Sequence, residues 1–231
     1  MQTIRHNLST INTRLVHAAK HAGRDPREIK LVAVSKKIGR DRIQSAVDCG
    51  QLCFGENYIQ EARDKIPFLA KNLSWHFIGH LQSNKARIAA ELFDVVETVD
   101  SLKLATALNK HLTDLRKTLS VLIQINLGGE QQKSGVPPAE AEKLIQDIHN
   151  RLPMLQVTGL MTMPPFFTDP ESVRPYFRQL RQTLDELTAK KLFGPHTRPE
   201  LSMGMSGDFE VAIEEGATII RIGTAIFGPR T

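Results

Sequence analysis

Two lysines close an apolar run near the start of the chain, at the point where a buried strand should end. The run reads KLVAVSKK, from Lys30 to Lys37. Alternation along a strand places Lys36 on the same face as Val32 and Val34, and leaves Lys37 to begin the turn. A lysine in a partly desolvated site has a lowered pKa, and its neutral amine can form a Schiff base with an aldehyde. The alternative is that both lysines extend from the rim into solvent.

An arginine stands inside a second apolar run, ATIIRIGTAIFG, near the C-terminus. Ile219, Arg221 and Gly223 would share one face of this strand, which places the guanidinium in the interior of the fold. A permanently charged group is costly to bury unless an acceptor meets it. A carboxylate such as Glu97 or Asp208 could be that acceptor, in a buried ion pair. A bound ligand could equally supply it.

Small and hydroxyl-bearing residues follow the last two apolar runs. Ser206 and Gly207 lie between a short strand and an amphipathic helix that should start near Asp208, and Gly223 and Thr224 come directly after the last strand. Backbone N–H groups at a helix N-terminus, together with hydroxyl groups, bind anions. Each pair also occurs in ordinary turns, but their placement at two neighbouring strand ends favours a phosphate site.

The remaining polar candidates are less specific. Asn57 follows an expected strand in the segment GENY, where its amide could hydrogen-bond a ligand ring or simply complete a turn. His76 and His80 lack an evident third ligand, so we expect no metal site. The sequence contains no G-x-S-x-G, Walker or dinucleotide-binding motif.

Eight short apolar or β-branched runs would position these residues. Helical patterns mostly separate the runs, and alternation of strand and helix is typical of parallel strands with crossover helices. We therefore expect an α/β fold, a single (β/α)8 TIM barrel, whose site lies at the carboxyl ends of the strands. A doubly wound open sheet is the alternative, and the count of eight favours closure. The runs span residues 31–36, 52–57, 74–79, 95–100, 121–126, 155–163, 201–206 and 218–223.

An extra helix precedes the first run. Apolar residues from Ile4 to Ala18 recur at helical spacing, and the helix should end near Gly23. We expect it to cover the bottom of the barrel. No linker or change in composition divides the chain, so residues 1–231 should form one domain.

Composition limits the class of protein. The formal charge is +5, but 30 basic residues are scattered among 25 acidic ones, which disfavours a nucleic-acid-binding surface. Cys49 and Cys53 have no second pair to complete a zinc site and are expected to be reduced, as in a cytoplasmic protein. The first residues lack the apolar core of a signal peptide, and no run is long enough to span a bilayer. We therefore expect no membrane partner.

Several ordered segments carry a resemblance to a known family. Along essentially its whole length the sequence closely resembles the pyridoxal phosphate homeostasis proteins of the YggS/PROSC type. The resemblance implies one barrel of the alanine racemase type that binds pyridoxal 5′-phosphate (PLP), with Lys36 forming the Schiff base and Arg221 approaching the pyridine nitrogen. The matching segments are LVAVSK, FGENYIQEA, WHFIGHLQSNK, INLGGEQQKSGV, GLMTMPP, LSMGMSGDFEVAIEEGAT and IIRIGTAIFG.

The same resemblance also implies which residues bind the phosphate and the ring of the cofactor. Ser206, Gly223 and Thr224 would hold the phosphate, and Asn57 would lie beside the ring. The phosphate assignment agrees with the residue types found after the last two strands. The family role is intracellular PLP, or vitamin B6, homeostasis, in which the protein buffers the cofactor or delivers it to PLP-dependent apo-enzymes.

The expected ring partner argues against robust catalysis. An arginine is itself a donor, so it favours an unprotonated pyridine nitrogen and a weaker electron sink. The eight units and the first helix leave no room for the extra β domain of the barrel racemases, and neither Tyr58 nor Tyr176 falls at an evident catalytic position. We expect a monomeric carrier without catalytic residues. The alternatives are a PLP-dependent racemase or lyase of low activity on a small amino acid, and a basic barrel that binds RNA or another anion.

Overall fold

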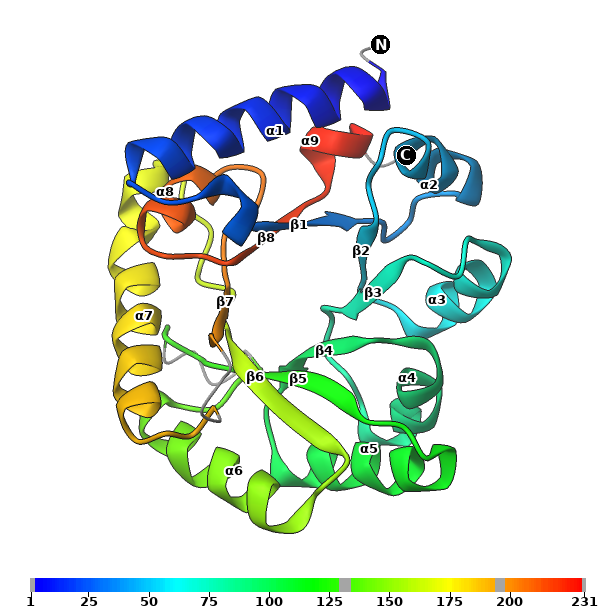
Figure 1. Cartoon of the computed structure of the whole chain (residues 1–231), viewed down its shortest axis with the longest axis vertical. Coiled ribbons are helices and arrows are strands. Elements are labelled where there is room, and N and C mark those ends of the chain that lie inside the picture. Colours follow the sequence, from blue (N-terminus) through cyan, green and yellow to red (C-terminus); the bar gives the residue numbers. More distant parts are fainter. Residues whose placement is uncertain (1–2, 129–133, 194–197, 230–231) are drawn as a thin grey trace.

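A closed barrel of parallel strands forms the centre of the molecule. The computed structural model describes residues 3–128, 134–193 and 198–229. Within them, eight strands pair in sequence order and β8 pairs with β1, while helices surround the ring (Figure 1). This confirms the (β/α)8 fold with an extra N-terminal helix. The strands are β1 (Lys30–Val34), β2 (Cys53–Glu56), β3 (Ser74–Phe77), β4 (Val95–Val99), β5 (Leu119–Gln124), β6 (Leu155–Met161), β7 (Glu200–Ser202) and β8 (Ile219–Ile222).

Helices fill the outer layer and begin where turn and capping residues predict. Ser101 is the N-cap of α5 and accepts a hydrogen bond from the Leu104 N–H at 3.3 Å. The helices are α1 (Ile4–His21), α2 (Arg40–Val47), α3 (Ile59–Lys65), α4 (Ala86–Leu92), α5 (Leu102–Leu115), α6 (Pro138–Arg151), α7 (Arg174–Ala189), α8 (Phe209–Glu214) and α9 (Thr224–Phe227). None of the helices in the described ranges is both long and apolar enough to cross a membrane.

Each predicted run overlaps one strand, but the strands end earlier than predicted. In β1 the ladder finishes when the Ser35 N–H donates to the Gly55 carbonyl at 2.9 Å, and the Ile38 N–H then closes a turn on the Ser35 carbonyl at 3.0 Å. The prediction that Lys36 ends the strand is therefore wrong, because Lys36 lies in the turn together with Lys37.

The seventh strand shows the largest difference from its predicted run. It ends at Ser202 rather than at Ser206. The cause is Gly204, whose φ of 93° is incompatible with an extended strand. A side chain there would also approach the Ala212 Cβ to 2.6 Å. The regular strand thus ends early, although the Arg221 N–H of β8 still donates to the Gly204 carbonyl at 3.0 Å, and Ser206 reaches the site on a turn.

The sequence predicted that the leading helix covers the bottom of the barrel, and this prediction is wrong. The helix lies outside the barrel, alongside α8 and α9 (Figure 1). Leu8, Ile11 and Leu15 are buried on its inner face, and the Asn7 side chain donates to the Ile226 carbonyl at 2.8 Å. Because α8 and α9 have only 6 and 4 residues, α1 completes the helical layer beside β8 and β1.

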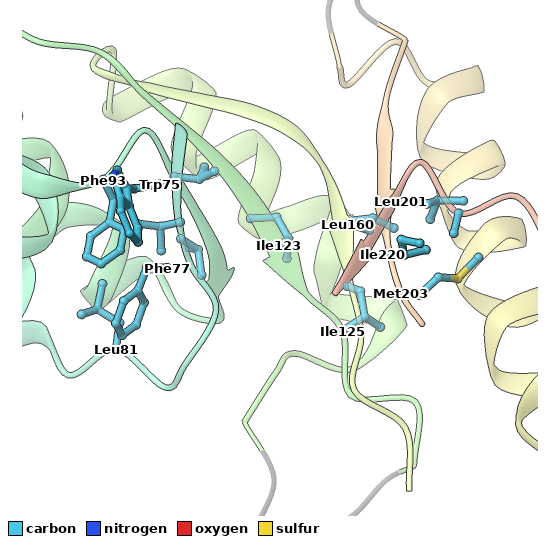
Figure 2. Packing of buried hydrophobic residues seen from close by; sticks show 14 of the residues in the cluster. Trp75, Phe77, Leu81, Phe93, Ile123, Ile125, Leu160, Leu201, Met203 and Ile220 are labelled. Carbon is cyan, nitrogen blue, oxygen red and sulfur yellow. The ribbon is translucent and has the colours of Figure 1, made fainter. Parts of the chain in front are cut away.

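Two apolar regions stabilise this arrangement. The larger one lies between strands and helices, where residues such as Trp75, Phe77 and Phe93 pack together (Figure 2). The Phe77 and Phe93 rings meet edge to face with centroids 5.2 Å apart. The smaller region contains the inward-facing residues Val32, Cys53, Leu122, Met161 and Ile219. It forms the apolar layer of the barrel interior below the polar groups described next.

Candidate functional site

A pocket of about 310 Å³ opens at the carboxyl ends of the strands. This volume lies at the lower end of the range typical of small-molecule sites, about 300–1,000 Å³. The pocket brings together every site residue predicted from the sequence, although they come from four different βα units. These residues are Lys36, Asn57, Ser206, Arg221, Gly223 and Thr224.

Apolar side chains complete the pocket, and the sequence predicted few of them. Val34 and Ile78 line it from the ends of β1 and β3, while Met163, Phe166 and Phe167 approach from the segment after β6. Val34 was detectable because strand alternation places it two residues before Lys36. Phe166 and Phe167 were not, since a loop has no periodicity that assigns its side chains to a site.

Lys36 enters the pocket from a tight turn. Its side chain is half-buried, whereas Lys37 is exposed. Lys37 has a φ of 60°, in the left-handed region that a residue with a side chain seldom adopts. Both lysines therefore belong to the turn, and they differ in that Lys36 lines the pocket while Lys37 is exposed.

Arg221 is buried at the base of the pocket and lies within a set of acceptors. Its Nη2 donates to the Thr162 carbonyl at 2.8 Å, and its Nη1 donates to the Ser202 hydroxyl. The Glu97 carboxylate lies 3.8 Å from Nη1, so one of the acceptors considered from the sequence, Glu97, forms a buried ion pair with Arg221. Burial lowers the pKa of Arg221, opposed by the charges of Glu97 and Asp208. The guanidinium remains a donor and also lines the pocket.

A buried histidine extends this polar network across the barrel. His76 Nδ1 lies 2.6 Å from Glu97 Oε1, and the Ser202 hydroxyl donates to Glu97 Oε2 at 2.5 Å. Burial would lower the pKa of His76, but Cys53 and Glu97 raise it to about 10. Burial likewise opposes ionisation of Glu97, yet His76 and Arg221 hold the pKa of this carboxyl below its usual value. The sequence did not predict this His76–Glu97 pair.

The residues expected to hold a phosphate lie at the starts of two short helices. Ser206 and Gly207 form the turn before α8, and Gly223 precedes α9, which begins at Thr224. The Asp208 carboxylate accepts the Met205 N–H at 2.5 Å and so fixes the turn that precedes α8. Burial raises the pKa of Asp208, against the effect of this hydrogen bond and of Arg221.

Asn57 supplies an acceptor that the described part of the protein does not use. Its Oδ1 is buried and has no hydrogen-bond partner among the described residues. A buried amide oxygen of this kind requires a partner, and a bound ligand or an ordered water can supply one. An amine, a guanidinium, an unsatisfied amide oxygen and hydroxyls at two helix starts together fit a phosphorylated aromatic aldehyde.

The other histidine candidate lies outside this pocket. His80 is exposed, and its Nδ1 lies 2.9 Å from the Ser134 hydroxyl. Among the described residues, no group of three or more His, Cys, Asp and Glu side chains could hold a metal ion.

Comparison with known proteins identifies the family. The profile described as "Alanine racemase, N-terminal domain" matches residues 1–231. The pyridoxal phosphate homeostasis protein of Escherichia coli K12 is 45% identical over 100% of this chain and 98% of its own. The chain belongs to the pyridoxal phosphate homeostasis protein family. This confirms the resemblance seen in the sequence.

Solved structures of this family and of more distant proteins share the fold. The PipY protein of Synechococcus elongatus, solved with PLP bound, is 37% identical with a TM-score of 0.80, covering 94% of this chain and all of its own. Alanine racemase of Corynebacterium glutamicum is 22% identical with a TM-score of 0.72, covering 98% of this chain and 61% of the racemase. The racemase therefore extends beyond the barrel that it shares with this homeostasis protein family.

Proposed function

We propose that this protein binds PLP as a Schiff base on Lys36 and serves intracellular vitamin B6 homeostasis by buffering or delivering the cofactor. The observation that carries the proposal is the pocket, which gathers an amine, a guanidinium and two helix starts around one cavity. The family name of its relatives and the PLP bound to PipY support the same ligand.

Each of the predicted site residues has a role in this proposal. Lys36 provides the amine for the covalent bond, and Arg221 donates toward the pyridine nitrogen. The Oδ1 of Asn57, which is buried without a hydrogen-bond partner among the described residues, would accept a hydrogen bond from the bound cofactor. The phosphate binds at the two helix starts, through Ser206, Gly223 and Thr224.

The bond to Lys36 is reversible, which suits a carrier. The neutral Lys36 amine attacks the aldehyde carbon, and the carbonyl oxygen leaves as water, so no oxidant or reductant is needed. Release is hydrolysis, which returns the amine and the free aldehyde, or exchange with another amine, in which PLP leaves as the imine of that amine and Lys36 regains its amine. PLP-dependent apo-enzymes are the proposed acceptors of the released cofactor, and small amino acids are the proposed amine partners. We place this exchange in the cytoplasm.

The composition of the pocket supports a carrier rather than an enzyme. Bound PLP supplies an electrophilic imine and an electron sink, but an arginine at the ring nitrogen weakens the sink. A racemase also needs acid and base groups on both faces of the substrate carbon. Among the described residues that line the pocket, the ionisable ones are Lys36, Asp208 and Arg221, and Asp208 is engaged by a backbone N–H.

Borohydride trapping tests the proposed linkage. The purified protein incubated with PLP should show imine absorbance, and reduction should fix one pyridoxyl group on Lys36 in the peptide mass map. Lys36→Ala should lose both signals, while Lys37→Ala, its matched neighbour, should retain them. A label on any other lysine would overturn the assignment.

The carrier proposal has a separate test with the same preparation. Amino acids incubated with the PLP-loaded protein in D₂O should exchange their α-protons no faster than with free PLP. Exchange at an enzymatic rate would replace the carrier with the alternative, a racemase or lyase.

A further inference from the structure

A polar cluster lies on the outer side of the barrel wall, directly behind the turn that carries Lys36. It consists of Ser35, Glu56, Glu61 and Lys65, and we refer to it as the Lys65 cluster. Ser35 follows β1, Glu56 ends β2, and the other two belong to α3, which lies outside the barrel (Figure 1). Glu56 is fully buried, and the Lys65 side chain is only 12% exposed. Nothing in the proposed chemistry of the pocket uses these groups.

Within the cluster, one ammonium group connects two strands to a helix. Lys65 Nζ donates to Glu56 Oε1 at 3.1 Å, to Glu61 Oε2 at 2.8 Å and to the Ser35 carbonyl at 3.0 Å. The Ser35 hydroxyl donates to the same Glu56 oxygen at 2.7 Å. All three donor positions of the ammonium thus have acceptors, as a buried lysine requires.

These contacts hold the residues on both sides of Lys36. Ser35 is fixed through its carbonyl and its hydroxyl. On the other side, the Lys37 N–H donates to Glu61 Oε2 at 2.7 Å, and Lys65 contacts that same oxygen. The backbone before and after Lys36 is therefore tied to one group, the Lys65 ammonium, directly or through Glu61.

The turn needs such support. Lys37 adopts a φ of 60°, which is disfavoured for a residue with a side chain and persists where surrounding contacts impose it. Stability alone does not explain a buried ion cluster, since well-packed apolar residues at such positions often stabilise a fold equally well. The bonds of the Lys65 cluster are concentrated on the two neighbours of the proposed nucleophile.

We propose that Lys65 is a positioning residue for Schiff-base formation: through Ser35 and Glu61 it fixes the turn so that the Lys36 amine stands over the pocket. This inference rests on the proposed function, because it assumes that Lys36 is the residue that binds PLP. Pre-organisation of this kind favours the covalent bond by reducing the ordering that bond formation must impose. It leaves the contacts of the phosphate and the ring unaffected.

A double-mutant cycle separates positioning from general support of the fold. Lys65→Met is made in the wild-type chain and in Lys36→Ala, and the dissociation constant for PLP is measured for all four proteins. In the presence of Lys36 the substitution should weaken PLP binding about tenfold and reduce the imine absorbance at saturating PLP. In the Lys36→Ala background, where only non-covalent contacts remain, it should change binding by less than about twofold.

Two further variants serve as controls. Lys117 is a comparable lysine remote from the pocket, whose Nζ donates to the Phe93 and Ala90 carbonyls at 2.8 and 3.3 Å. Lys117→Met should leave PLP binding and imine absorbance at wild-type values. Lys65→Arg keeps the cation and should recover part of the imine signal. If Lys65→Met does not fold, Glu61→Ala replaces it, because it removes the acceptor of the Lys37 N–H and should give the same coupling to Lys36.

The outcomes distinguish this inference from the proposed function. Equal weakening of PLP binding in both backgrounds, or no weakening in either, overturns the positioning role while borohydride still labels Lys36. Failure of wild-type protein to be labelled at Lys36 overturns the proposed function, and this inference with it.

Discussion

At the scale of single residues, the charged groups inside the barrel alternate in sign, so each buried charge has an opposite charge beside it. Glu97 lies between two cationic partners, since it contacts His76 at 2.6 Å and Arg221 at 3.8 Å. A buried carboxylate with partners on both sides stays ionised, and each partner stays protonated because the carboxylate is near. Arg221 can then present a fixed donor to the pocket, which is the property that the proposed ring contact requires.

The pH dependence of stability tests this network. The pKa of His76 in the folded protein is about 10, above the ordinary value of 6.5, because of its contacts with Glu97 on β4 and Cys53 on β2. Protonated His76 therefore stabilises the folded protein fully below about pH 6.5, and this contribution is lost as the pH rises through 10. Between these values the free energy of unfolding should fall by up to about 1.4 kcal/mol per pH unit.

His76→Gln should remove this component of the slope. Urea unfolding of wild type and variant at intervals from pH 6 to 10 measures it, because the difference between the two curves isolates His76 from other titrating groups. Curves that stay parallel over this range would show that His76 is neutral in the folded protein.

At the scale of the elements, the sequence predicted which segments form strands better than where they end. Apolar runs identified all eight strands, but Met203 and Met205 continue the apolar pattern beyond β7, and only the conformation of Gly204 shows that the strand has ended. Residue types at the strand ends, together with the family resemblance, predicted the polar residues that line the pocket. The pairing of His76 with Glu97 and the contribution of Phe166 depend on which side chains meet in space, and no single-strand pattern contains that information.

Close approaches of backbone between neighbouring elements give a prediction at this scale. A Cβ on Gly79 would lie 2.2 Å from the Asn57 carbonyl oxygen, and a Cβ on Gly159 would lie 2.0 Å from that of Glu200. Since both obstacles are backbone, Gly79→Ala and Gly159→Ala should each destabilise the protein by about 1–3 kcal/mol. Denaturant unfolding measures this cost.

The two glycine variants should differ in their affinity for PLP. Gly79→Ala must displace Asn57, whose side chain lines the pocket, and so should weaken PLP binding as well as stability. Gly159→Ala displaces Glu200, which is not among the pocket-lining residues, and should leave the affinity of the folded fraction unchanged. Equal affinity in both variants would show that the position of Asn57 does not matter for binding.

At the scale of the whole molecule, the N-terminal helix completes a layer that the barrel helices leave open. The 18-residue α1 lies beside the short helices α8 and α9, and Arg24 just after it donates to the Ile213 and Ala217 carbonyls at 2.7 and 2.8 Å. The apolar face of α1 is therefore covered by other elements of the same chain. The loops before α8 and α9 also carry Ser206 and Gly223, so the helix supports the part of the barrel that forms the proposed phosphate site.

A monomer is the expected state of this molecule, with and without PLP. All six predicted site residues line one pocket of a single chain, so we expect a monomer to bind PLP. Among the described residues, the most exposed large apolar side chains, Phe166 and Phe68, lie on different elements, the segment after β6 and the end of the α3 region. Sedimentation equilibrium should give 25.8 kDa over about a hundredfold range of protein concentration. A mass that doubles with concentration, or on addition of PLP, would show instead that the binding unit is a dimer.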